Sequence, residues 1–219
     1  MKNSATTPSN YVQSLVSRLK KMNLHLNAHV LNAFRLIPRE LFVQEQDKKY
    51  AYKDTPLAIP MNQTISAIHM YGIMLSVELC DPQPGINVLE IGTGSGYGAA
   101  LLAKSVEPDI VISIERHKPL VEYSRNNLKV CGIQNVEIIH GDGTLGIPGK
   151  KFDRILVTAT GKKIPEPLIK QLKPDGWMII PLLVNYNEWL CKVYLDENNE
   201  LQQELLMQVR FVPLIGSEN

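Results

Sequence analysis

Three glycines at alternate positions, Gly92, Gly94 and Gly96, follow an apolar run that ends at Ile91. Glycine lacks a Cβ, so such a turn can bend sharply, adopt positive φ and lie directly against a ligand. Strong helix formers follow at residues 97–103, and a helix N-terminus offers unpaired N–H groups to ligand oxygens. This strand, turn and helix predict a nucleotide-type site at the carboxyl edge of a parallel sheet. The motif alone leaves open a tight turn without a ligand, because its third glycine comes one residue earlier than in the dinucleotide fingerprint.

Two acids follow the next two apolar runs. Glu115 directly follows residues 110–114, and Asp142 lies between Gly141 and Gly143 after residues 136–139. A carboxylate in the first place can accept both hydroxyls of a ribose. The second can orient an adenine amine or the backbone beside it. Each acid could instead cap the helix that follows it. Taken together with the glycine turn, they predict an adenosine site assembled from successive loops.

The elements that would position these residues alternate between strand and helix. Apolar runs at 86–91, 110–114, 136–139, 152–157 and 177–180 predict buried strands. Helices are expected at 97–103 and at 120–130, the second with Gly132 as its C-cap. A further helix is expected at 168–172, and Pro165 suits the first helical position ahead of it. Alternation at 189–195, a turn at 196–199 and a return run at 201–212 predict a C-terminal antiparallel hairpin.

The first third of the chain reads as a tail followed by short helices. Residues 1–10 are expected to form a loose tail, and residues 11–22 an amphipathic helix. Asn27 can cap a second helix that ends at Pro38, and a third is expected at 68–79. His25 and His29 have helical spacing, but neither a neighbouring acid nor a third ligand accompanies them, so we predict no metal site.

The composition excludes several classes of protein. Lys and Arg total 23 against 22 Asp and Glu, and the sequence shows no basic stripe, which weighs against a nucleic-acid binder. No apolar run approaches the ~18 residues of a membrane span. The polar first ten residues contain no signal-peptide core. Three widely spaced cysteines favour a reducing compartment, so a cytoplasmic protein is expected.

The glycine spacing and the closing hairpin resemble class I S-adenosylmethionine-dependent methyltransferases more than dehydrogenases. Residues 157–160 lack the Asn/Asp-Pro-Pro-aromatic sequence of enzymes that methylate DNA adenine. Six segments between residues 33 and 216 are similar, in order and spacing, to the protein-L-isoaspartate O-methyltransferases. The most specific are Gln-Thr-Ile-Ser at 63–66 and Phe-Val-Pro-Leu-Ile-Gly at 211–216; the others are 56–59, 88–97, 141–146 and 164–168.

The resemblance implies a Rossmann-like α/β fold with a mostly parallel seven-stranded sheet, helices on both faces and a C-terminal antiparallel hairpin. One domain, 1–219, would comprise N-terminal helices and an acceptor-side loop (11–85), a cofactor-binding core (86–181) and a hairpin with tail (182–219). The implied reaction moves a methyl group from S-adenosyl-L-methionine to the α-carboxylate of L-isoaspartyl residues in damaged proteins. The methyl ester then cyclises to a succinimide, which opens partly to normal aspartate. Isoaspartyl proteins or peptides would be the partners of a monomer.

The resemblance also implies roles for individual residues. Ser66 corresponds to the family's catalytic serine, and Thr64 offers a second hydroxyl. The expected cofactor-binding residues are Glu90, Gly92, Thr93, Gly94, Gly96, Glu115, Asp142 and Gly143. The expected acceptor contacts are Asn62, Gln63 and His69. For Ser66 the alternative is a helix N-cap, and for His69 an ordinary position in a first helical turn.

A sparse active site suits this chemistry. A carboxylate, with a reference pKa of about 4, is already ionised at neutral pH, so it needs no general base. A sulfonium is a good leaving group, which leaves alignment of the reactants as the main task of the protein. A hydroxyl such as that of Ser66 can bind one carboxylate oxygen and direct the other at the methyl group.

The chain departs from the family pattern mainly near the expected acceptor. Pro60, Met61 and Asn62 stand where glycines are usual, and Ile68 replaces a proline. Residues 160–162 and 182–183 differ as well. Two alternatives therefore stay open: a related carboxyl methyltransferase that acts on aspartate in a dedicated peptide, and a non-catalytic S-adenosylmethionine-binding protein.

Overall fold

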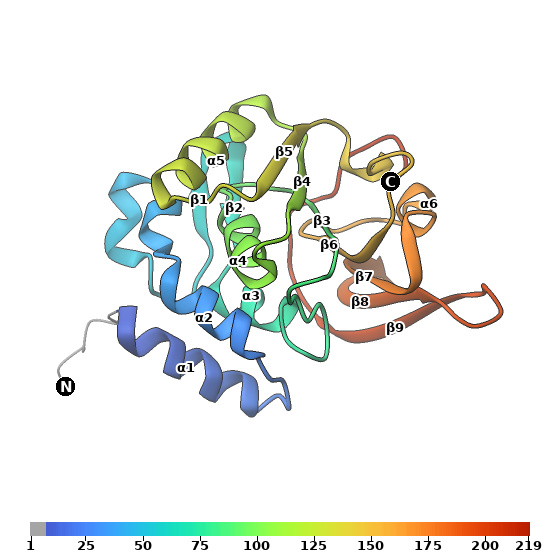
Figure 1. Ribbon diagram of the computed structural model, residues 1–219, viewed down its shortest axis with the longest axis horizontal. Helices are drawn as coiled ribbons and strands as arrows, with labels where there is room; N and C mark the ends of the chain where they lie inside the picture. Colours follow the sequence, from blue (N-terminus) through green and yellow to red (C-terminus); the bar gives the residue numbers. More distant parts are fainter. Residues whose placement is uncertain (1–7) are drawn as a thin grey trace.

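A seven-stranded sheet organises the computed structural model, which describes residues 8–219 (Figure 1). The strand order is β5-β4-β3-β6-β7-β8-β9; β3 to β7 are parallel, and β8 and β9 are antiparallel to their neighbours. The strands are β3 (Val88–Ile91), β4 (Val111–Glu115), β5 (Val136–His140), β6 (Phe152–Val157), β7 (Leu172–Val184), β8 (Asn187–Leu195) and β9 (Leu201–Gln208). The predicted fold class and the closing hairpin are confirmed.

Both faces of the central strands are covered, so every residue of β3 and β4 is buried. One face packs against α4 (Tyr97–Val106) and α5 (Lys118–Cys131). Helix α2 (Ala28–Leu36) packs on α4, and α1 (Pro8–Lys20) packs on α2 and α3 (Ile68–Met74), so the five helices lie together on this side in Figure 1. The opposite face packs against the four-residue α6 (Glu166–Ile169) and the C-terminal segment through Leu214. Among residues 8–219, no helix is long and apolar enough to cross a bilayer.

The N-terminal elements differ in extent from their predictions. Helix α1 begins at Pro8, so the prediction of a loose tail is wrong for residues 8–10, while residues 1–7 lie outside the described part of the chain. Helix α3 ends at Met74 and not at residue 79, because the N–H of Val77 donates to the carbonyl of His25 and the chain leaves the helical path.

A small hairpin, β1 (Leu57–Ile59) and β2 (Gln63–Ile65), stands between α2 and α3. The sequence predicted only an extended segment here. Pro60 and two residues with left-handed backbone, Met61 (φ 62°) and Asn62 (φ 56°), make the connection. The hairpin brings the segment from 63 to 66 back toward the sheet.

Two further boundaries also shift. Helix α6 ends at Ile169, because β7 already begins at Leu172 and pairs with Phe152 before a bulge, so the strand is much longer than the predicted 177–180. Strand β9 ends at Gln208 and not at 212, because the N–H groups of Val209 and Phe211 donate to the carbonyl and carboxylate of Glu188. The chain then crosses the end of β6 toward the predicted site.

Asn27 caps α2 as predicted, and its substitution tests this part of the fold. Its side-chain oxygen accepts the N–H of Val30 at 2.9 Å, and its amide donates to Asp81 and to the carbonyl of Pro82. We expect Asn27→Ala to lower the free energy of unfolding by about 1–2 kcal/mol, measured by urea titration. Asn126→Ala, an exposed change within α5, is the control and should have no such cost. Equal stability of Asn27→Ala and the unmodified protein would contradict the capping role.

Candidate active site

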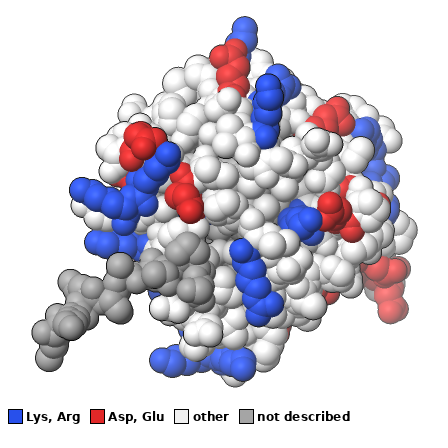
Figure 2. Space-filling view, turned by 60° about the vertical axis from the view of Figure 1, so that its left-hand side comes forward, with Lys and Arg blue, Asp and Glu red and all other residues white. Residues whose placement is uncertain are grey.

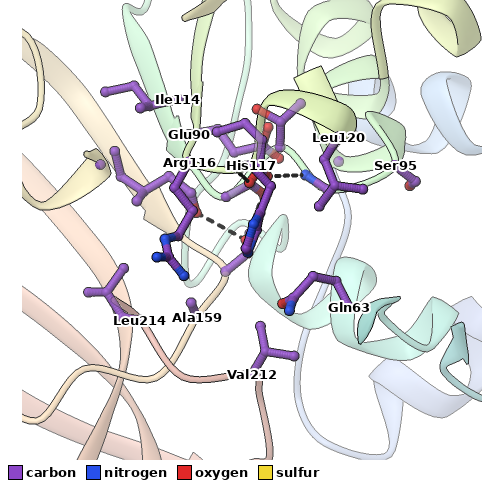
Figure 3. Close-up of a pocket in the computed structure, with 18 of the residues that line it drawn as sticks. Gln63, Glu90, Ser95, Ile114, Arg116, His117, Leu120, Ala159, Val212 and Leu214 are labelled. Atoms are coloured by element: carbon purple, nitrogen blue, oxygen red, sulfur yellow. Dashed lines mark hydrogen bonds between the residues drawn. The ribbon is translucent and has the colours of Figure 1, made fainter. Parts of the chain in front are cut away.

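A cavity opens at the carboxyl ends of β3, β4 and β6, where the three strand ends converge (Figure 3). Its walls come from segments far apart in the sequence. From the sheet edge they comprise residues 90–95 at the end of β3 and in the turn after it, residues 114–117 at the end of β4 and directly after it, and Thr158 and Ala159 after β6. The others are Gly98, Leu120, Gly143, residues 212–215 of the C-terminal segment, and Gln63, Thr64, Ser66 and Tyr71 from the acceptor side.

The glycine turn forms one wall of this cavity. Gly92 (φ 94°) and Gly94 (φ 55°) both line it with left-handed backbone. A Cβ at Gly92 would lie 2.4 Å from the hydroxyl oxygen of Thr158, so a side chain there would clash with the residue that follows β6. Gly96 has a different role, because it begins α4 and faces Ser124 of α5 instead of the cavity. Two of the three predicted glycines therefore lie at the cavity.

Glu115, the last residue of β4, accepts a hydrogen bond from this turn. Its side chain is 4% exposed, and its two oxygens accept the N–H groups of Gly94 and His117, each at 2.9 Å. Glu115 lines the cavity at the position predicted for a ribose-binding acid. A carboxylate has about four lone-pair sites, so two N–H donors leave acceptor capacity for a ligand hydroxyl.

Glu90 is a buried acid that lines the same cavity. The Ser113 hydroxyl donates to the Glu90 carboxyl at 2.5 Å and lies 2.6 Å from the Thr93 hydroxyl. Hydrogen bonds thus connect the side chains of Glu90, Ser113 and Thr93. Burial raises the pKa of Glu90 to about 8, against the Ser113 hydrogen bond and with the help of the Glu115 charge. Near neutral pH the acid is therefore mostly neutral. A cation in the cavity would favour its ionised form.

Asp142 lies beside the cavity and not in its wall. Its carboxylate accepts the N–H and hydroxyl of Thr144, at 2.9 and 2.6 Å, and the N–H of Ser217 at 2.7 Å. Burial alone would raise the pKa of Asp142, but the hydrogen bonds from Thr144 and Ser217 hold it below its ordinary value. Gly143 does line the cavity. The structure thus uses Asp142 as the cap of the 3₁₀ turn Gly143–Leu145 and as an anchor for the C-terminal segment.

The acceptor-side residues Gln63, Thr64 and Ser66 line the cavity opposite the glycine turn. Gln63 and Thr64 belong to β2, where Thr64 pairs with Ala58 of β1. Ser66 directly follows this strand. It is not the cap of α3, because the N-cap position is Ala67. The alternative interpretation of Ser66 as a helix cap is therefore not realised.

Asn62 and His69 do not line the cavity. Asn62 is exposed in the turn between β1 and β2. The His69 ring Nδ1 lies 2.8 Å from the Asp54 carboxylate, which also accepts the His69 backbone N–H. His69 thus occupies an ordinary position in the first turn of α3. Among residues 8–219, no group of three or more His, Cys, Asp or Glu side chains could hold a metal ion.

Several lining residues were not singled out from the sequence. Arg116 and His117 directly follow Glu115, and their side chains reach into the cavity in Figure 3. Their position after a strand-end acid was the available signal. Tyr71, on α3, and Thr158 carry no sequence pattern that distinguishes them from ordinary core or loop residues.

The buried acid Glu90 should make stability depend on pH. Because its pKa is raised from 4.5 to about 8 on folding, its contribution is fully present below about 4.5 and is lost as the pH rises through 8. We expect Glu90→Gln to remove this decline, so the stability of the variant relative to the unmodified protein should increase between pH 5 and pH 9. Urea titrations across this range measure the effect, with the exposed Glu122→Gln as control. Parallel pH profiles for Glu90→Gln and the unmodified protein would contradict the assignment.

Comparison with known proteins supports the resemblance found in the sequence. Residues 10–219 match the family model described as protein-L-isoaspartate(D-aspartate) O-methyltransferase. Protein-L-isoaspartate O-methyltransferase of Pyrococcus horikoshii is 48% identical over 92% of this chain and 91% of its own, and that of Methanopyrus kandleri is 45% identical over 94% and 92%. A Plasmodium falciparum protein assigned to the same enzymes and crystallised with S-adenosyl-L-homocysteine has a TM-score of 0.79 at 30% identity, covering 93% of this chain and 97% of its own. The chain therefore belongs to the protein-L-isoaspartate(D-aspartate) O-methyltransferase family.

Proposed function

We propose that this protein transfers the methyl group of S-adenosyl-L-methionine to the α-carboxylate of L-isoaspartyl residues in damaged proteins. The resulting ester then cyclises to a succinimide, which opens partly to normal aspartate and so begins repair. Family membership supports this reaction. The observation that carries the proposal is that the glycine turn and the hydroxyl-bearing segment at residues 64–66 line opposite sides of one cavity.

The cavity residues fit the proposed methyl donor. Glu115 keeps acceptor capacity for ribose hydroxyls, and Gly92 and Gly94 present backbone without a side chain at the cavity wall. Glu90, whose pKa is raised to about 8 by burial, provides a nearby acid that a cationic ligand would ionise. When bound, S-adenosyl-L-methionine supplies an electrophilic methyl group on a sulfonium. Asp142 would meet the adenine amine only by exchanging its contact with Ser217.

The residues on the opposite wall would align the acceptor. The hydroxyl of Ser66, or of Thr64, donates a hydrogen bond to one oxygen of the isoaspartyl carboxylate. The other oxygen then forms the bond to the methyl carbon, while the carbon–sulfur bond breaks and its electron pair goes to sulfur. No proton has to move in this step, because the acceptor is already an anion. Orientation of the two reactants is the contribution of the chain.

The proposed partners are isoaspartyl proteins or peptides, bound by a monomer in the cytoplasm. All three cysteines, Cys80, Cys131 and Cys191, are free, which is typical of a reducing compartment. Positive and negative side chains are interspersed on the face shown in Figure 2. On this face the two signs do not separate into the contiguous basic patch that binding of a nucleic acid favours.

A second candidate acceptor is an aspartyl residue in a dedicated peptide. The observation that favours it is the turn at Met61 and Asn62, whose left-handed backbone and exposed Met61 side chain stand next to the acceptor wall. This turn could restrict which peptide reaches Thr64 and Ser66.

Methyl transfer to paired peptides separates these functions. The assay uses two synthetic peptides of identical sequence, one with an L-isoaspartyl and one with an L-aspartyl residue, together with radiolabelled S-adenosyl-L-methionine. We expect transfer to the isoaspartyl peptide alone. Transfer to the aspartyl peptide alone would remove the repair function. Tight donor binding without transfer to either peptide would indicate a non-catalytic binding protein.

Ser66→Ala tests the alignment role. We expect the rate of methyl transfer to fall by about 10- to 100-fold, because the carboxylate loses a donor that orients it, on the scale set by hydrogen bonds to charged groups. Affinity for S-adenosyl-L-homocysteine, measured by calorimetry, should change less than threefold, within roughly 0.65 kcal/mol. Thr55→Ala, a hydroxyl removal in the same segment outside the cavity, is the control. An equal loss of transfer and of cofactor affinity would show that Ser66 belongs to the cofactor side.

A further inference from the structure

Arg39 is a fully buried arginine that stands outside the cavity described above. It follows Pro38 in the 3₁₀ turn Arg39–Phe42, and its side chain is 0% exposed. None of the ion pairs among residues 8–219 includes it. An arginine remains charged in proteins, so this guanidinium is a buried cation that relies on neutral partners.

Two of those partners are backbone carbonyls at the two ends of one segment. Arg39 Nε donates to the carbonyl of Ala51, and Nη2 donates to the carbonyl of Ser66, each at 2.8 Å. The segment between them, 51–66, contains the β1–β2 hairpin and carries Gln63 and Thr64 to the cavity. One rigid, planar side chain therefore holds both ends of the acceptor-side segment.

Aromatic rings fix the guanidinium itself. Its central carbon lies 5.2 Å from the ring centroid of Tyr97 and 6.0 Å from that of Tyr71, and the two rings meet edge to face at 5.0 Å. Tyr97 is fully buried at the start of α4, so it provides a fixed base in the helix that follows the glycine turn. Tyr71 lines the cavity. Arg39 thus connects the cofactor-side helix with two residues of the acceptor wall, Tyr71 and Ser66.

Other contacts also hold the segment, but at its outer part. Gln44 donates to the carbonyl of Ala58, and the Asp54 carboxylate accepts from Arg18 and His69. The Arg18 and Asp54 side chains are half and about one-third exposed, and ion pairs of this kind contribute little to stability. None of these contacts reaches a residue that lines the cavity, whereas Arg39 binds Ser66 directly.

We propose that Arg39 is a positioning residue for the methyl acceptor, which acts by holding the Ser66 carbonyl so that the Ser66 hydroxyl stays directed into the cavity. This inference rests on the proposed function. Nη1 of this buried guanidinium already has no hydrogen-bond partner among residues 8–219. Loss of the Ser66 carbonyl would leave Nη2 unsatisfied as well, so movement of the backbone at Ser66 carries a cost. Misplacement of an aligning group by about 1 Å can reduce a rate by about 100-fold. The effect should fall on the acceptor step and leave the cofactor side intact.

The test compares Arg39→Met, Arg39→Lys and the matched control Arg18→Met, which removes a surface contact of the same segment. Hydrogen exchange of the free proteins, followed by mass spectrometry, is the first measurement. We expect Arg39→Met to accelerate exchange of the amides in 55–66 by at least tenfold while α4 and α5 keep their protection. Arg18→Met should exchange like the unmodified protein. This readout needs no methyl acceptor, so it stays informative if the proposed function fails.

The second measurement is activity toward an isoaspartyl peptide. We expect kcat/KM to fall by about 100-fold in Arg39→Met and by a smaller factor in Arg39→Lys, which keeps the charge but cannot serve both carbonyls in one plane. The Kd for S-adenosyl-L-homocysteine should stay within threefold of that of the unmodified protein.

Unchanged exchange and activity would overturn the inference, as would an equal loss of cofactor affinity. Failure of both Arg39 variants to fold would also overturn it, because the guanidinium would then support the whole domain. An unmodified protein that ignores the peptide would instead contradict the proposed function.

Discussion

The parallel alignment of β3, β4 and β6 is the constraint on which the candidate site depends. Because their carboxyl ends reach the same edge of the sheet, the glycine turn, Glu115 and Thr158 meet although they are far apart in the sequence. The hydrogen bond from the Gly94 N–H to Glu115 joins two of these strand ends directly. The turn therefore has one shape, set by the sheet and not by the loop alone, and such preorganisation reduces the cost of binding a ligand.

Three ionisable side chains of the described chain are buried, and none forms an ion pair. Glu115 binds backbone N–H groups, Glu90 binds a hydroxyl, and Arg39 binds backbone carbonyls and aromatic faces. Each is expensive to bury, and each lies at the cavity or directly behind one of its walls. Buried ionisable groups without a counter-ion are thus concentrated where a charged donor and a charged acceptor would have to meet, as is typical of functional sites.

Local patterns in the sequence predicted most of the cofactor side of this arrangement. On the acceptor side, the family resemblance identified Gln63, Thr64 and Ser66, which line the cavity, but the hairpin that positions them was not predicted. Strands β3 and β4 are continuous apolar runs, and the glycines and Glu115 follow them directly, so short-range patterns were sufficient. The β1–β2 hairpin has strands of only three residues joined through Pro60, too short for a detectable alternation. Arg39 binds both ends of the segment that contains this hairpin, yet in the sequence it is only one more charged residue. Asp142 illustrates a different limit, because its contact with Ser217 joins residues 75 positions apart and no local pattern reveals it.

A crystal structure of the protein with S-adenosyl-L-homocysteine and an isoaspartyl peptide tests the central claim most directly. We predict that the ribose hydroxyls lie within about 3.2 Å of the Glu115 carboxylate. The sulfur should face the acceptor carboxylate, which the Ser66 hydroxyl contacts from the opposite wall. Cofactor bound away from the turn at residues 92–95, or a peptide carboxylate that meets neither Ser66 nor Thr64, would contradict this account.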